Sequence, residues 1–236
     1  MDTQTRLALK KKDKFAQATA SSMTWVSGHR SSVTRWVIVG VVLIALVAAG
    51  LTFYMMRSNA ADAALGSALD IYVAPLAAAG APPEPGTYAT AGERSKAANQ
   101  QFVAVTKQYS WLPQGAHAHY FAGVTDQDLG QTASAETELK AAADSWDRNL
   151  ANLAKLALAG IYHQTSRDPQ AIDLYNGLIA KPSETVSANV ARLDLADLYA
   201  AESKQADARK LWAAVKDADK DGAAGSIATQ KLTPKQ

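Results

Sequence analysis

The chain has 236 residues, which is enough for one membrane anchor and one domain of about 180 residues. It contains no cysteine, which excludes a disulfide framework, thiolate catalysis and a cysteine zinc site. The overall net charge of +2 hides an asymmetry, because residues 1–35 carry a net charge of +5 and residues 57–236 a net charge of −3. The basic isoelectric point is therefore no indication of nucleic-acid binding, and none is expected.

An uncharged apolar segment runs from Trp36 to Met56 and is bracketed by Arg35 and Arg57. As a helix rising about 1.5 Å per residue it would be about 31 Å long, close to the thickness of the hydrocarbon core of a bilayer. Aromatic residues near both ends are typical of the membrane interface. We predict one transmembrane helix over residues 36–56, in contact with the lipid bilayer. A buried core helix and a cleaved signal peptide are the alternatives, and the length of the segment and of the preceding tail disfavours both.

The charge asymmetry predicts how the chain crosses the membrane. Lys and Arg near a span resist translocation, so the basic side stays in the cytoplasm. We expect residues 1–35 to be a basic cytoplasmic tail and residues 57–236 to lie in the periplasm, with the span in a bacterial inner membrane. The lysines of the tail enforce this orientation, and contact with anionic lipid is the alternative role.

Two helices joined by a proline-rich loop are expected next. Apolar residues recur at helical spacing over residues 59–79. The sequence GAPPEPGT cannot continue that helix, because its three prolines lack amide donors. A second amphipathic helix follows over residues 90–111 and is expected to end before Pro113.

The remaining residues contain an internal repeat. Small and bulky apolar residues recur in three windows offset by 36 and 37 residues, and each window holds two amphipathic helices around a polar turn. The recurring positions are Gly123, Ala135, Leu139 and Ala142 in the first window, Ala159, Tyr162, Ala171, Tyr175 and Leu178 in the second, and Ala196, Tyr199, Ala208, Trp212 and Val215 in the third. Small residues are needed where the two helices of a pair cross closely. Generic helical hairpins with chance spacing are the alternative.

The predicted fold class is therefore all-α, with a single N-terminal transmembrane helix followed by a solenoid of helical hairpins. We expect helical pairs at about 59–111, 115–147, 151–181 and 186–220, and a C-terminal cap at 226–232. The third pair, which contains the second window, resembles the tetratricopeptide repeat, which has a period of about 34 residues, through Leu158, Ala159, Tyr162, Ala171 and Tyr175. Asp126 departs from that pattern, because it replaces an aromatic residue.

A basic tail, one span and three or four such pairs resemble the family of YfgM, the ancillary subunit of the SecYEG translocon. The repeat domain of that family is akin to that of the cell-division coordinator CpoB. The resemblance lies in topology and repeat layout, not in a catalytic signature. It implies a periplasmic domain that binds proteins beside the translocon and the chaperone network, in that family with the membrane-anchored chaperone PpiD.

In the repeat pattern, certain positions of the first helix of each pair face the concave side of the stack, where solenoids bind peptides or a partner helix. These positions are His117, Tyr120, Val124, Gln127, Asp128, Leu153, Leu156, His163, Gln164, Val190, Leu193 and Asp197. The lining is mixed apolar with few charges, so partner binding is expected to rest on apolar burial and shape. Alternatively, several of these residues pack against the first pair.

No cofactor, metal or enzymatic activity is expected. Asp217, Asp219 and Asp221 resemble the start of a calcium loop, but its twelfth position is Ala228 instead of Glu. His117 and His119 diverge on a helix and cannot share a metal, and Asp126 and Asp128 beside a turn are expected to be solvated. The sequence favours a membrane-tethered interaction scaffold at the protein-export site. An envelope-assembly or division adaptor is one alternative, and a structural module that self-associates into a homo-oligomer is another.

Overall fold

The computed structural model describes residues 30–78 and 82–233, with side chains from residue 34 onward. These residues form two compact units, one up to Met56 and the other from Arg57. Within the described ranges the chain is helical, with no strand and one isolated bridge between Leu76 and Tyr88. The predicted all-α class is confirmed. Residues 1–29, most of the predicted basic tail, lie outside the described residues.

The first described helix, α2 (Arg30–Tyr72), contains the whole predicted span. Among the described helices it is the one that is long and apolar enough to cross a membrane by length and composition. The helix expected over residues 59–79 is present as far as Tyr72, where it ends seven residues early, and it is continuous with the predicted span within α2. The Ala-rich sequence after Arg57 offers no proline to stop the helix until Pro75, and a residue before proline is disfavoured in the helical conformation.

Residues 57–72 of α2 form the first helix of the second unit. Ala61 and Ala68 are fully buried, in clusters with residues of α3 (Ala91–Gln108) and α4 (Pro113–Asp128). Helix α3 is shorter than the predicted range 90–111. Pro113 begins α4 instead of closing α3, because the first helical position needs no amide donor.

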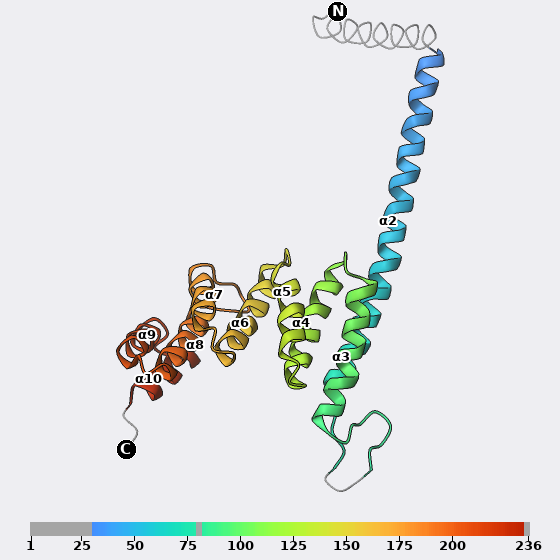
Figure 1. Ribbon diagram of the computed structural model, residues 1–236. Helices are drawn as coiled ribbons and strands as arrows, with labels where there is room; N and C mark the ends of the chain where they lie inside the picture. The colour runs from blue at the N-terminus through green and yellow to red at the C-terminus, as the bar shows by residue number, and fades with distance from the viewer. Residues whose placement is uncertain (1–29, 79–81, 234–236) are drawn as a thin grey trace, which may run out of the picture. The chain divides into compact units, whose positions relative to one another are not determined.

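Six more helices follow α4, and each packs against the next one in the chain (Figure 1). They are α5 (Thr132–Ala143), α6 (Arg148–Gln164), α7 (Asp168–Ala180), α8 (Ala188–Ala201), α9 (Gln205–Ala218) and α10 (Ala223–Leu232). Helices α4 and α6 also contact each other, and so do α8 and α10.

The turn between the two helices has the same backbone geometry in three helical pairs, α4–α5, α6–α7 and α8–α9. Gly130, Ser166 and Ser203 have positive φ angles of 72°, 57° and 62°, and they are spaced by 36 and 37 residues. The amide after each one donates to the carbonyl five residues earlier, at 2.7–2.8 Å. This pattern is the Schellman motif, which ends a helix by satisfying carbonyls that lack an intrahelical partner. The sequence offsets therefore correspond to a repeated structure.

The recurring small residues lie where the helices of each pair cross. Ala135, Ala159, Ala171, Ala196 and Ala208 are fully buried. Gly123 is also buried, and a Cβ atom placed on it would lie 2.6 Å from Cγ of Leu139. No neighbouring atom can yield easily at that distance, since packed side chains fill the interior. Small side chains at these positions allow the helices to approach closely.

If the three turns are equivalent, replacing the glycine of one turn with serine and replacing the serine of another with glycine should affect thermal stability differently. Gly130→Ser should lower the free energy of unfolding by about 1 kcal/mol, because a side chain in the left-handed conformation is sterically crowded. For a domain of this size that corresponds to a fall in melting temperature of about 2–4 °C. The measurement is thermal unfolding followed by circular dichroism.

The matched control is Ser203→Gly, which should not lower the melting temperature, because glycine adopts the same angle without crowding. Equal destabilisation by both substitutions would contradict the equivalence.

Candidate protein-interaction face

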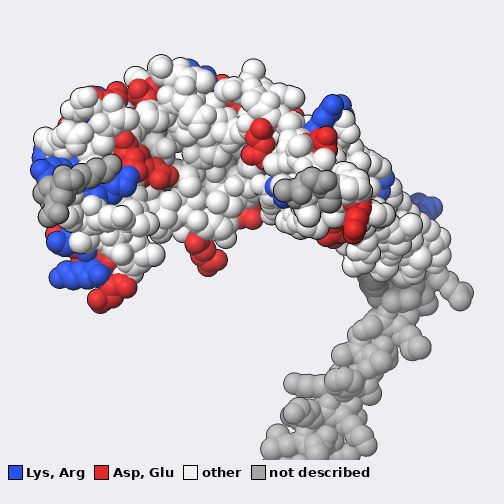
Figure 2. Space-filling view, turned by 90° about the horizontal axis from the view of Figure 1, so that it is seen from below, with Lys and Arg blue, Asp and Glu red and all other residues white. Residues whose placement is uncertain are grey.

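The interaction face is defined here as the twelve predicted binding positions on α4, α6 and α8. Helices α4 and α6 touch, so the positions on these two helices lie on neighbouring elements. Figure 2 shows one side of the unit that begins at Arg57. Uncharged residues predominate on this side, and the acidic and basic side chains lie in small groups. The twelve positions differ in exposure and in bonding.

Five apolar positions of the face are partly exposed. Tyr120, Val124, Leu153 and Leu156 are half-buried, and Val190 is 36% exposed. Leu153 and Leu156 rest against the core cluster of α6, α7 and α8, and Tyr120 rests against that of α5 and α6. Each side chain therefore has one surface in the core and another that is free to contact a partner.

Tyr120 also belongs to an aromatic group with Tyr72, Phe102 and Phe121. Its ring lies edge-on to that of Phe121 at 5.3 Å between centroids, and Phe121 stacks on Phe102 at 5.2 Å. Burial, together with the nearby Tyr72, raises the pKa of Tyr120. The hydroxyl is therefore a neutral hydrogen-bonding group at any ordinary pH.

Three polar positions of the face already have partners within the chain. Oδ2 of Asp128 accepts a hydrogen bond from Ser95 Oγ at 2.9 Å. Nδ1 of His163 lies 2.7 Å from Oδ1 of Asp168, and Asp197 forms an ion pair with Lys231 at 2.8 Å. Because these groups are engaged, apolar contact dominates what the face offers.

Two predicted positions are placed differently from the others. Leu193 is only 9% exposed and packs with α9 and α10, so it belongs to the core and not to a binding surface. His117 lines a cavity of about 540 Å³ beside Trp111 and Trp146, and its Nδ1 lies 3.0 Å from the carbonyl oxygen of Pro113. Of the two glutamines, Gln127 is half-buried and Gln164 is exposed.

The expectation that Asp126 is solvated is wrong, because its side chain is 1% exposed. Oδ1 accepts a hydrogen bond from the amide of Asn99 at 2.7 Å, and Oδ2 accepts one from Ser134 Oγ at 2.5 Å. The same amide also reaches Thr125 Oγ1 at 3.1 Å. The carboxylate therefore joins α3, α4 and α5, where the other pairs carry a tyrosine. A buried polar group requires partners of this kind.

Sequence reasoning missed an acidic position next to the face, Asp194. Burial, and then the neighbouring Asp197, raise the pKa of Asp194, and burial followed by these two carboxylates raises that of Tyr175. The signal available in the sequence was the spacing of three residues between the two aspartates, which places them on one helical face.

Asp219, in the turn before α10, has a structural role, since its Oδ2 accepts a hydrogen bond from the backbone amide of Gly225 at 3.1 Å.

An ion-pair group links the second and third helical pairs. Arg167 donates to both carboxylate oxygens of Glu136, at 3.1 and 2.6 Å, and Lys140 donates to the same carboxylate at 2.6 Å. The guanidinium also lies over the ring of Tyr162, 4.5 Å from its centroid. Hydrogen bonds from Arg167 and then from Lys140 lower the pKa of Glu136 from 4.5 to about 2.

The interaction face thus consists mainly of half-buried apolar side chains, and α4 and α6, which carry most of them, are in contact. Within the described residues, no group of three or more His, Asp or Glu side chains is placed to hold a metal ion. None of the protein-family models, curated proteins or solved structures compared with this chain matches it.

The depressed pKa of Glu136 predicts a specific pH dependence. A carboxylate that titrates at about 2 in the folded chain and near 4.5 when unfolded stabilises the fold fully above pH 5. That contribution should decline as the pH falls from about 4.5 through 2. Glu136→Gln should therefore lower the melting temperature at pH 7 and lose this effect at about pH 2.

The measurement is the difference in melting temperature between the two proteins across pH 2–8. Asp173→Asn, at an exposed position on α7, serves as the control for removing a carboxylate. A difference for Glu136→Gln that does not change with pH would contradict the ion-pair origin of the effect.

Proposed function

We propose that the chain is a membrane-anchored protein-interaction scaffold whose helical pairs form a tetratricopeptide-like solenoid. The observation that carries the proposal is the threefold recurrence of one turn geometry and of buried small residues, at spacings of 36 and 37 residues. A stack of equivalent pairs presents a long continuous face, which suits binding of extended segments or of a partner helix.

The anchor in this proposal is the apolar part of α2, residues 36–56, and the orientation is N-terminus in. The excess of basic residues ahead of the span supports a cytoplasmic tail. Residues 57–236 then lie in the periplasm of a bacterial inner membrane. Tethering holds a weak binding surface near membrane partners at millimolar effective concentration.

The chemistry of the interaction face suggests the character of its ligand. Tyr120, Leu156 and Val190 offer apolar surface on three successive alternate helices, whereas Asp197 is already paired with Lys231. A segment with several apolar side chains complements this surface. Its binding energy would come mainly from the buried apolar anchors.

By the family resemblance, the proposed partners are subunits of the SecYEG translocon and a membrane-anchored periplasmic chaperone. An adaptor role in envelope assembly or cell division is the second proposal, supported by the same kind of face. A self-association module is the third, since apolar faces of equivalent shape also suit a second copy. Neither nucleic-acid binding nor catalysis is part of any of these proposals.

The absence of cysteine makes the proposed orientation directly measurable. Asp221→Cys, in the exposed turn before α10, should react with a membrane-impermeant maleimide in cells with a permeabilised outer membrane. Thr5→Cys in the tail should react only after the inner membrane is broken. The opposite labelling pattern would overturn the N-in orientation.

Site-specific photo-crosslinking in cells tests the interaction face. A photoreactive residue at Val190 or Gln164 should yield adducts containing translocon or chaperone subunits. The matched control positions are Asn176 on α7 and Lys210 on α9, which are exposed on the other helices of the pairs and should give little product.

The outcomes separate the three proposals. Adducts with envelope-assembly or division proteins favour the second, and adducts between two copies of the chain favour the third. Equal yields from Asn176 and Val190 would contradict a binding role of the interaction face.

A further inference from the structure

The most exposed large apolar side chain beyond the span belongs to Trp146. Its relative exposure is 103%, so the whole indole ring stands in solvent. It lies between α5 and α6, in the turn that joins the second helical pair to the third. Removing an aromatic side chain of this size from water is favourable. A ring kept outside the fold is therefore available for contact with something other than this chain.

A second tryptophan lies on the same edge of the stack. Trp111 is 56% exposed and belongs to the turn between α3 and α4, which joins the first pair to the second. Both residues border the cavity of about 540 Å³ that is also lined by His117 and His119. We call the residues 109–113 and 144–148 the tryptophan edge. The two connecting turns lie on the same side of the unit in Figure 1.

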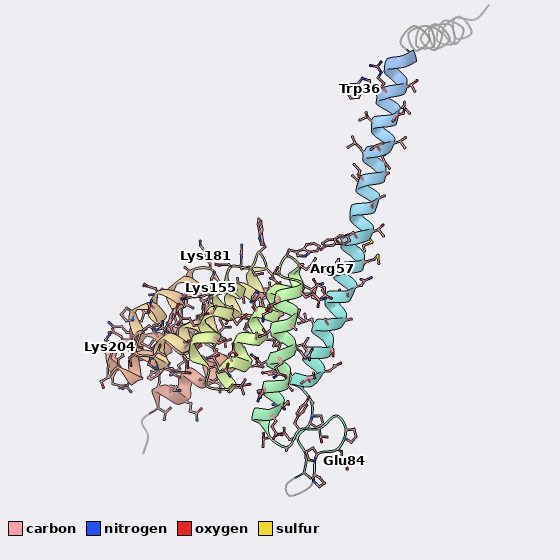
Figure 3. The ribbon with its side chains drawn as sticks, turned by 45° about the vertical axis from the view of Figure 1, so that its right-hand side comes forward. Trp36, Arg57, Glu84, Lys155, Lys181 and Lys204 are labelled. Carbon is pink, nitrogen blue, oxygen red and sulfur yellow. The ribbon has the colours of Figure 1, made fainter. Side chains whose placement is uncertain are left out.

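The tryptophan edge begins where the chain leaves the predicted span. Nη2 of Arg57 donates to the carbonyl oxygen of Gln108 at 3.2 Å, and its guanidinium lies over the ring of Tyr109, 5.0 Å from the centroid (Figure 3). Arg57 is joined by a peptide bond to Met56, the last residue of the apolar segment. Since consecutive Cα atoms are about 3.8 Å apart, the edge begins on the order of 10 Å from that segment.

This distance compares with the thickness of a headgroup layer. The hydrocarbon core of a bilayer is about 30 Å thick and the whole bilayer about 40–45 Å, so each headgroup layer measures about 5–8 Å. Tryptophan prefers that layer, because its ring is apolar while its N–H seeks a polar partner. The residues around Trp146 are Asp144, Asp147 and Arg148, which gives the edge little net charge.

We propose that the tryptophan edge rests in the headgroup layer of the same bilayer that holds residues 36–56, with Trp146 as its main contact. The inference rests on the membrane anchor of the proposed function and adds a second attachment that orients the domain. Lipid contact through the two indoles would involve His117, which lines the same cavity, and leaves the other positions of the interaction face to bind protein. Because the edge is nearly neutral, the contact depends on ring insertion and is insensitive to anionic lipid and to salt.

The test uses the full chain in nanodiscs of zwitterionic lipid, with and without bromine on the acyl chains near the headgroup. Three variants each keep one tryptophan, at position 36, 146 or 212, and carry Phe at the other four positions. Emission of Trp36 and Trp146 should be lower in the brominated nanodiscs. Emission of Trp212, which is 6% exposed in the core, should be unchanged.

Because Phe at position 212 alters a core contact, a second series keeps every tryptophan. It places an environment-sensitive thiol-reactive fluorophore at Asp144→Cys, or at Gln131→Cys at the opposite end of the same helical pair as the matched control. Quenching by brominated lipid is expected at 144 and not at 131. Adding anionic lipid or salt should change neither result.

Each contrary outcome has a distinct meaning. Quenching of Trp36 without quenching of Trp146 overturns this inference and leaves the anchor intact, whereas no quenching of Trp36 overturns the anchor itself. A Trp146 shielded from both brominated lipid and aqueous iodide overturns the inference in favour of a protein contact. Quenching at Trp146 that requires anionic lipid and disappears in salt overturns the assignment to the indole rings.

Discussion

The close crossing of the two helices within each pair is the constraint on which the rest of this structure depends. Helices approach closely only where their side chains are small, and the fully buried Ala135, Ala171 and Ala208 supply such contacts in three successive pairs. The close crossing turns the second apolar surface of each pair toward the next pair. Bulky residues such as Leu139, Tyr175 and Trp212 fill that space and transmit the packing along the stack.

The three Schellman turns make the crossings equivalent. Each turn reverses the chain through one residue of positive φ and ties off the carbonyls at the end of the preceding helix. Between the second and third pairs, Glu136 and Arg167 add a link outside the core. In the first of these repeats, Asp126 takes the place of a tyrosine, and hydrogen bonds from Asn99 and Ser134 compensate for burying its polar side chain.

The interaction face and the tryptophan edge are two chemically different surfaces of the same domain. Alternate helices contribute half-buried apolar side chains to the interaction face, while the connecting turns carry the tryptophan edge. A protein partner and a lipid surface would therefore meet different parts of the same stack.

The features that could be predicted from the sequence are those that depend on composition or on residues close together in the chain. The apolar segment, the all-helical class and the repeat offsets are visible in the sequence, because they rest on composition and on spacing along one helix. The end of α2 at Tyr72 was missed, since an alanine-rich sequence gives no local stop before Pro75. Repeat spacing placed Tyr120, Val124 and Val190 at partly exposed positions, as expected.

The remaining features required the tertiary structure. Leu193 is buried because α9 and α10 pack over it, and Asp197 is paired because Lys231, 34 residues away, reaches it. Asp126 is buried because Asn99 and Ser134 arrive from two other helices. Spacing along one helix determines which residues share a face. Only the packing of the other helices decides whether that face is covered, because the atoms that cover it come from distant parts of the chain.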